Sequence, residues 1–160
     1  MNRLNQLAIF HLDDGKFALF LSAVIRTIRV VEITSLPKAP EIVLGVINMH
    51  GRIIPVFDIR KRFHLPQREM QLCDQLIVAS TSKRTVALLV DSVDDVKEIP
   101  EEKIFAAEQI LPELEYVEGV MKTEDGMVLI HDLEKFLSLH EEKALDEALE
   151  ALNRDERKDG

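Results

Sequence analysis

Residues near the C-terminus begin like the metal-binding helix of a zinc peptidase. In such a helix a histidine binds zinc and the neighbouring glutamate acts as a general base. His140 and Glu141 have these residue types in this order. A second histidine must follow one helical turn later, because both rings bind the same ion. That position is Ala144. The sequence therefore predicts no metal site in this segment.

Two other motifs with chemical potential are equally incomplete. Gly45 and Gly51 enclose apolar residues, and no Lys-Ser or Lys-Thr pair follows them, so they indicate a hairpin rather than a phosphate-binding loop. Cys73 is the only cysteine, which excludes an internal disulfide and a multi-cysteine metal site. Because it follows Leu72, we interpret Cys73 as a small, half-buried residue and not as a nucleophile.

The histidines do not form a catalytic set either. They are scattered over different predicted elements, at His11, His50, His64, His131 and His140. We therefore expect a binding module that is not an enzyme, with no cofactor and no metal. Two alternatives stay open at this point. One is a β-barrel protein that binds a small ligand or effector, and the other is a hydrolase whose site has no recognisable motif.

Charge is distributed unevenly along the chain. Residues 1–70 carry ten Lys/Arg and six Asp/Glu, a net charge of +4, whereas residues 71–160 carry ten and 23, a net charge of −13. Nucleic-acid binding needs a basic stripe that neutralises phosphates. The cluster Arg60-Lys61-Arg62 is short and follows Asp58, so we interpret it as a solvated helix face. We expect no nucleic-acid partner.

Length and composition are those of an ordinary globular chain. The 160 residues, 46% hydrophobic and 31% charged, allow one domain or two small ones with a shared core. No apolar run approaches the roughly 18 residues of a membrane-spanning helix. Residues 1–6 lack the long apolar stretch of a secretory signal. We expect a cytoplasmic protein that does not insert into a membrane.

The chain contains an internal repeat. Residues 18–21 align with residues 87–90 at an offset of 69, and Gly45-Val46 aligns with Gly119-Val120 at an offset of 74. A duplicated unit of about 70 residues is long enough for a small β-barrel.

Short apolar or alternating segments predict strands through most of the chain. Asp13-Asp14-Gly15 joins the first two, because these residue types tolerate the positive φ of a hairpin turn. The predicted strands cover residues 7–12, 16–21, 25–33, 44–49, 52–59, 75–80, 85–91, 96–99, 116–122 and 127–131. Residues 100–115 are expected to form a helical or irregular connection. We predict approximate sub-barrels over residues 14–70 and 71–138, with strand 7–12 paired to either, and an amphipathic helix and tail over residues 139–160.

Residues 45–60, GVINMHGRIIPVFDIR, strongly resemble the central motif of the CheW family, commonly GVINLRGxVIPVxDLR. The resemblance covers roughly residues 7–138, with further matches at residues 17–19, 36–37, 87–93, 116–119 and 129–133. It implies a mainly β fold of two SH3-like five-stranded β-barrels packed side by side, followed by the C-terminal helix. It also implies a non-enzymatic adaptor that couples chemoreceptors to a chemotaxis histidine kinase in two-component signalling.

The resemblance implies two protein partners at receptor arrays on the inner face of the membrane. One barrel would pair with the histidine kinase regulatory domain, and the groove between barrels would hold the tip of a chemoreceptor cytoplasmic helical hairpin. The receptor-groove candidates, placed by the motif, are Ile25, Ile28, Val46, Ile47, His50, Val90 and Val93. The kinase-contact candidates are Arg60 and Arg62. Barrel core is the alternative interpretation of Ile47 and Val90.

Two positions depart from the family pattern. His50 stands where the family usually has arginine, and Ile25 stands where it often has a glutamate that pairs with that arginine. An exposed ion pair contributes at most about 1 kcal/mol, so its loss costs the fold little. A neutral His50 beside Ile25 predicts a less polar groove and hence a different partner helix.

Overall fold

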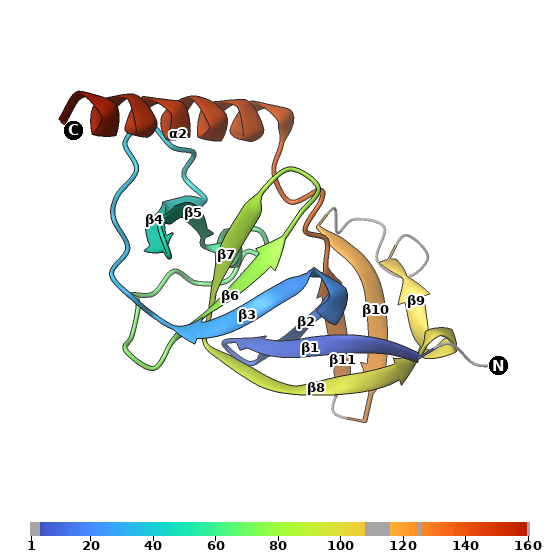
Figure 1. Cartoon of the computed structure of the whole chain (residues 1–160). Helices are drawn as coiled ribbons and strands as arrows, with labels where there is room; N and C mark the ends of the chain where they lie inside the picture. The colour runs from blue at the N-terminus through green and yellow to red at the C-terminus, as the bar shows by residue number, and fades with distance from the viewer. Residues whose placement is uncertain (1–3, 108–115, 125, 160) are drawn as a thin grey trace.

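The computed structural model describes residues 4–107, 116–124 and 126–159, and over these residues the chain is mainly β. Two sheets lie side by side, and helix α2 (Leu139–Asp159) runs past the end that carries β4, β5 and β7 (Figure 1). Within the described residues, no helix combines the length and apolarity needed to cross a membrane. The expected mainly β fold with two sheets and a C-terminal helix is confirmed.

Each sheet combines hairpins with one parallel contact. The six-stranded sheet has the order β8 (Ser92–Pro100), β1 (Leu4–Leu12), β2 (Gly15–Phe20), β11 (Gly126–His131), β10 (Val117–Thr123) and β9 (Ile104–Ala106). The five-stranded sheet has the order β3 (Val24–Arg29), β6 (Gln75–Ser80), β7 (Thr85–Val90), β5 (Arg52–Phe57) and β4 (Val43–Met49). Among the neighbouring strands of these two sheets, β2–β11 and β5–β7 pair in parallel and the others pair antiparallel.

The aligned segments of the internal repeat occupy equivalent places in the two sheets. Strands β1 and β2 correspond to β6 and β7, and β4 and β5 correspond to β10 and β11. The first hairpin of each repeat, however, pairs with strands of the other repeat. The sheets therefore group the strands differently from the expected sub-barrels 14–70 and 71–138. Strand β1, which could have joined either sheet, pairs with β2 and β8.

One sheet has six strands instead of the expected five. The additional strand is β9, which pairs with β10 through Gly119 and Ala106. Its three residues lie within the segment 100–115 that we expected to be helical or irregular. A pairing this short adds an edge through backbone hydrogen bonds and leaves little periodicity in the sequence.

Side chains on the two faces of each strand enter different cores. In β6, Leu76 points into a core inside the five-stranded sheet, whereas Ile77 points into a core that both sheets and α2 share. The six-stranded sheet also has two covered faces: Ala18 of β2 points into a core inside this sheet, and Leu19 points into the shared core. Because both faces are covered, the strands have nearly continuous apolar runs.

Local signals account for the turns and for the start of α2. Asp13 and His50 both adopt positive φ, at 52° and 53°, in the turns of the hairpins β1–β2 and β4–β5. At α2, the Ser138 hydroxyl accepts a hydrogen bond from the Glu141 backbone N–H at 3.1 Å. The Glu141 carboxylate accepts one from the Ser138 N–H at 2.9 Å, which completes a capping box.

Candidate protein-protein interaction surface

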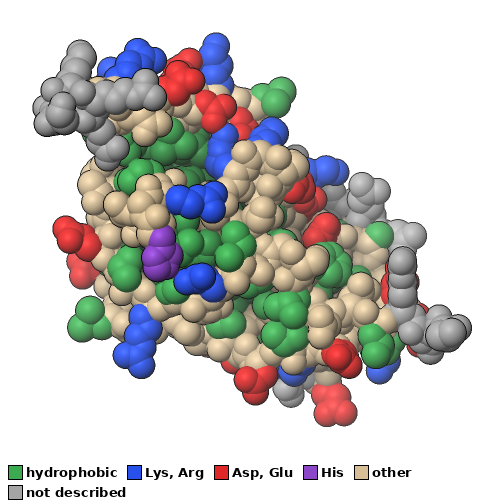
Figure 2. Space-filling model, viewed as in Figure 1, with side chains coloured by type: hydrophobic (Ala, Val, Ile, Leu, Met, Phe, Trp, Pro, Cys, Tyr) green, Lys and Arg blue, Asp and Glu red, His purple; other side chains and the backbone are tan. Residues whose placement is uncertain are grey.

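Strand β3 presents an apolar and basic surface at the edge of the five-stranded sheet. Ile25 is 47% exposed at a bulge in the pairing with β6, and Arg26 and Arg29 are also exposed. Ile28 is half-buried and packs in the same cluster as Met49. Figure 2 shows hydrophobic side chains across the middle of this face of the molecule, with Lys and Arg among them and most acidic side chains toward its rim. Such a surface suits an amphipathic partner helix.

His50 lies next to β4, the other edge strand of the five-stranded sheet. It follows Met49 in the β4–β5 turn and is exposed. The Gly51 N–H that follows it donates to the Asn48 side-chain oxygen at 2.9 Å, which fixes the turn. The structure thus places Ile25 and Ile28 on one edge strand of this sheet and the His50 turn beside the other, with Ile28 and Met49 packed against the same cluster.

Three other groove candidates lie in the interior. Val46 and Val90 are buried in the shared core, and Ile47 is buried inside the five-stranded sheet. Core packing, the alternative interpretation for Ile47 and Val90, is what the structure shows. Val93, at the start of β8, is half-buried against the shared core. Within the described part of the chain, Val46 and Val90 therefore fill part of the space between the sheets, and Val93 lies at its border.

Arg60 lies in an internal network of ion pairs that we call the Arg60 junction, formed by Arg60, Arg68, Asp13, Asp74 and Asp91. The Arg60 side chain is only 6% exposed and donates to Asp13 at 2.7 Å and to Asp91. Arg68 donates to the same Asp91 at 2.5 Å and to Asp74 at 2.6 Å. The expected solvated face at residues 60–62 is wrong for Arg60, because the fold packs it between acidic side chains.

The protonation states of the Arg60 junction reflect this packing. Burial opposes the charged form of Asp91, but the hydrogen bonds from Arg60 and Arg68 outweigh it and hold its pKa below the usual value. Burial also opposes the charge of Arg60, and the contacts with Asp13 and Asp91 nevertheless raise its pKa. Asp91 and Arg60 are therefore both ionised at neutral pH.

Arg62 joins helix α2 to the sheets. Its guanidinium lies over the Tyr116 ring at 5.1 Å, donates to the Phe136 carbonyl at 2.6 Å and pairs with the Glu141 carboxylate. Burial disfavours the charged form of Glu141, but the hydrogen bonds from Arg62 and Ser138 lower its pKa. The Arg62 side chain is 14% exposed, so most of its donor capacity serves internal contacts.

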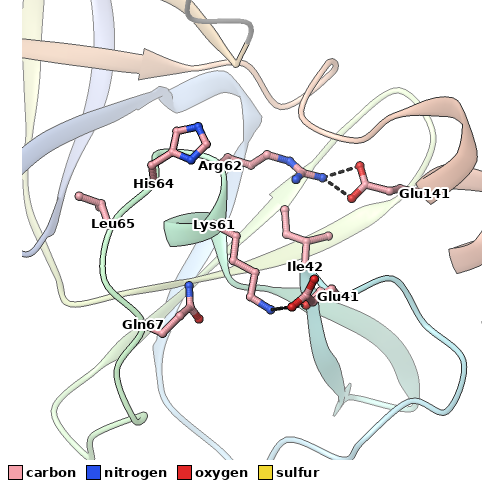
Figure 3. A pocket seen from close by; sticks show the side chains of 8 residues that line it. All are labelled: Glu41, Ile42, Lys61, Arg62, His64, Leu65, Gln67 and Glu141. Carbon is pink, nitrogen blue, oxygen red and sulfur yellow. Dashed lines mark hydrogen bonds and ion pairs between the residues drawn. The ribbon is translucent and has the colours of Figure 1, made fainter.

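A pocket of about 510 Å³ opens beside this pair, between residues 61–67 and the start of α2. Figure 3 shows its charged side chains turned toward one another, Lys61 toward Glu41 and Arg62 toward Glu141. Lys61 also donates to the Glu41 carbonyl at 2.6 Å. Because these four formal charges are already paired, the pocket offers no net charge that would select an ionic ligand.

His131 is a buried polar residue whose burial was not predicted from the sequence. It is 1% exposed, and its ring packs against those of Phe63 and Phe136 at 5.6 Å and 5.3 Å. Neither ring nitrogen has a hydrogen-bonding partner within the described part of the chain. Burial, with a smaller contribution from the charge of Arg62, lowers its pKa to about 3. His131 is therefore neutral at physiological pH.

Sequence reasoning missed the partners of the basic residues. Asp13 was assigned only to a turn, and Asp74, Asp91 and Arg68 had no role, because their positions along the chain do not reveal that they meet. The sequence Asp58-Ile59-Arg60 could have indicated a capped turn before Arg60, since the Asp58 carboxylate accepts a hydrogen bond from the Arg60 N–H at 3.2 Å.

Cys73 is exposed, which corrects the half-buried interpretation. Among the described residues, no group of His, Cys, Asp and Glu could hold a metal ion.

Comparison with known proteins agrees with the fold and the motif. The family model described as CheW-like domain matches residues 6–141. Chemotaxis protein CheW of Rhizobium meliloti (strain 1021) is 30% identical over 141 residues, which are 87% of this chain and 91% of that protein. Chemotaxis protein CheW of Thermotoga maritima is 30% identical over 128 residues, which are 80% and 84% of the two chains.

A solved structure extends the comparison to three dimensions. The crystal structure of scaffolding protein TtCheW from Thermoanaerobacter tengcongensis superposes with a TM-score of 0.76 at 31% sequence identity. The superposition covers 82% of this chain and 91% of that one. With the family match spanning both sheets and the start of α2, the chain belongs to the CheW-like family.

Proposed function

We propose that this chain is a non-enzymatic adaptor that couples chemoreceptors to a chemotaxis histidine kinase. The observation that carries the proposal is the match of residues 6–141 to the CheW-like domain, on a fold similar to that of a protein described as a scaffold. The relatives named above are chemotaxis proteins. The adaptor would act in the cytoplasm, at receptor arrays on the inner face of the membrane.

The receptor is proposed to bind at the five-stranded sheet, through β3 and the His50 turn. Ile25 and Ile28 would supply the apolar contact for a helical hairpin, and Val93 would contribute from the rim of the space between the sheets. Exposed apolar side chains framed by polar ones are the usual basis of such recognition. Val46, Ile47 and Val90 would support this surface from beneath, since they are buried.

The kinase regulatory domain is proposed to bind through a sheet edge other than the β3 edge that is proposed for the receptor. A small sheet leaves unpaired backbone groups at its edges, which a similar domain can cover. Arg60 and Arg62 would affect kinase binding indirectly, because both guanidinium groups are committed to internal contacts. A charge reversal at either residue would therefore destabilise the fold, so a loss of kinase binding in that variant would not identify a direct contact.

Binding measurements with a receptor cytoplasmic fragment and the kinase regulatory domain test the proposal. Ile25→Glu should weaken receptor binding by about tenfold or more, since it places a charge in the centre of an apolar contact. Met127→Glu is the matched control, because Met127 on β11 has the same 47% exposure as Ile25. Equal receptor affinities of the two variants would contradict the placement, and failure of the unmodified chain to bind either partner would refute the adaptor function.

A further inference from the structure

We propose that the Arg60 junction is a positioning element that fixes the angle between the two sheets, so that a movement imposed on one sheet by a partner reaches the other. The role of the junction in setting the angle stands on the geometry alone. Its use in transmitting movement between partners rests on the adaptor function proposed above. The residues concerned are not on the partner surfaces, and they would act through the relative position of those surfaces.

The Arg60 junction lies where the chain crosses from one sheet to the other. The chain passes between the sheets at residues 21–23 and again at Asp91, the single residue between β7 and β8. The Asp91 backbone N–H donates to the His11 carbonyl of β1 at 3.0 Å. Its carboxylate accepts from the Asp13 backbone N–H at 2.7 Å and from Arg60 and Arg68. The crossing residue is thus held from both sheets.

Arg60 itself bridges the sheets. It follows β5 of the five-stranded sheet, and its Nη1 donates at 2.7 Å to Asp13 in the β1–β2 turn of the six-stranded sheet. Its Nη2 donates to Asp91, and its own N–H donates to Asp58. A guanidinium is planar and rigid, so two donors on two carboxylates fix a direction as well as a distance.

The apolar contact between the sheets cannot set that direction alone. The shared core brings the sheets together through aliphatic and aromatic side chains, and apolar attraction is non-directional. Hydrogen bonds between charged groups are directional and are stronger where they are screened from water. A core of this kind with a polar bridge at one edge has one preferred angle. Without the bridge, several angles would have similar free energies.

Substitution of Asp13 can test the role of the Arg60 junction in setting the angle while the fold is kept. It lies in a turn at positive φ, a conformation that glycine and asparagine adopt readily, so Asp13→Gly and Asp13→Asn keep the turn. Asp13→Gly removes the acceptor for Arg60, whereas Asp13→Asn retains a neutral one. Asp91 still neutralises Arg60 in both variants. Asp14→Asn, in the same turn, is the matched control.

A distance measurement within the full chain tests the inference without any partner. Cys73 is exposed beside the five-stranded sheet, and Lys97 is exposed on β8 of the six-stranded sheet, so spin labels at Cys73 and at Lys97→Cys report the angle. We expect one narrow distance distribution for the parent chain and for Asp14→Asn. It should broaden in Asp13→Asn and broaden further in Asp13→Gly. Distributions that are the same in all four proteins would overturn the inference.

The second measurement concerns the transmission of binding. The affinity for the kinase regulatory domain is measured with and without a saturating receptor cytoplasmic fragment, and the ratio of the two Kd values is the coupling. We expect a ratio of about threefold or more for the parent chain and for Asp14→Asn, and a ratio near one for Asp13→Gly, with its separate affinities unchanged. A ratio near one in the parent chain, or an unchanged ratio in Asp13→Gly, would overturn transmission. If the parent chain binds neither partner, the adaptor function fails, and the spin-label distances still decide whether the junction sets the angle.

Discussion

Replacement of His131 by leucine should stabilise the protein. The imidazole is 1% exposed, packs against Phe63 and Phe136, and has no hydrogen-bonding partner within the described part of the chain. A buried polar group without a partner costs about 1–3 kcal/mol relative to water. Leucine is similar in volume and leaves no polar atom in this apolar site. We therefore expect His131→Leu to raise the free energy of unfolding at pH 7 by about 1–2 kcal/mol.

The advantage of His131→Leu should grow in acid. Burial holds the pKa of His131 at about 3 in the folded chain, against about 6.5 when the chain is unfolded. Because the folded pKa is lowered, the unfolded state binds a proton first as the pH falls below about 6.5, and folding stability is lost down to about pH 3. Between pH 7 and pH 5 this histidine costs the parent chain about 2 kcal/mol, a loss that the leucine variant does not share.

Urea denaturation at pH 7, 6 and 5 measures both effects. The control is His140→Leu, which makes the same substitution at an exposed position on α2, where no buried polar group is removed. Comparison with the parent chain at each pH cancels the contributions of other groups, including Asp91 and Glu141, whose lowered pKa values also cost stability in acid. A destabilised His131→Leu, or a difference from the parent that stays constant between pH 7 and pH 5, would refute the reasoning.

Three further substitutions test the packing and the ion pairs, each by urea denaturation. Gly45→Ala should cost about 3 kcal/mol or more, because a Cβ there would meet the Thr34 carbonyl oxygen far inside van der Waals contact, and a cost under 1 kcal/mol would contradict this. Glu141→Gln should cost about 1–2 kcal/mol, since it removes the carboxylate from Arg62, and the loss should shrink in acid as Glu141 is protonated in the parent. Arg60→Met should cost about 3–5 kcal/mol by leaving the junction carboxylates unpaired, and a neutral effect would show that the Arg60 junction is not formed in solution.

The strands and turns could be predicted because their signals are local. Asp13-Asp14-Gly15 and His50-Gly51 have the residue types of tight turns, and the structure has positive φ at Asp13, His50 and Gly51. The motif at residues 45–60 was sufficient for the family, which the comparisons confirm. Most strands lie where the apolar runs predict them, but β3 ends at Arg29 and not at residue 33, and β8 begins at Ser92 and not at residue 96. Strand β9 was not predicted, because its three residues contain no usable periodicity.

The exposed surface could not be predicted to the same degree. Val46 and Val90 belong to strands that are apolar on both faces, so the sequence does not say which face a second layer covers. Ile25 and Val93 remain accessible because they lie at a bulge and at the start of a strand. The receptor-groove candidates therefore include accessible residues and buried ones, and the sequence could not separate the two groups.

The exchange of hairpins joins the two repeats into one unit. Each sheet contains a hairpin from the other repeat, and the shared core covers Leu19 of one sheet and Leu88 of the other. Neither repeat can complete a sheet alone, so the repeats are joined by strand pairing as well as by packing. Separation of the repeats would therefore require loss of backbone hydrogen bonds, which suits the proposed adaptor because it would hold two partners in a defined relation. The two sheets are held together by the shared apolar core, and the proposed role of the Arg60 junction is to set the angle between them.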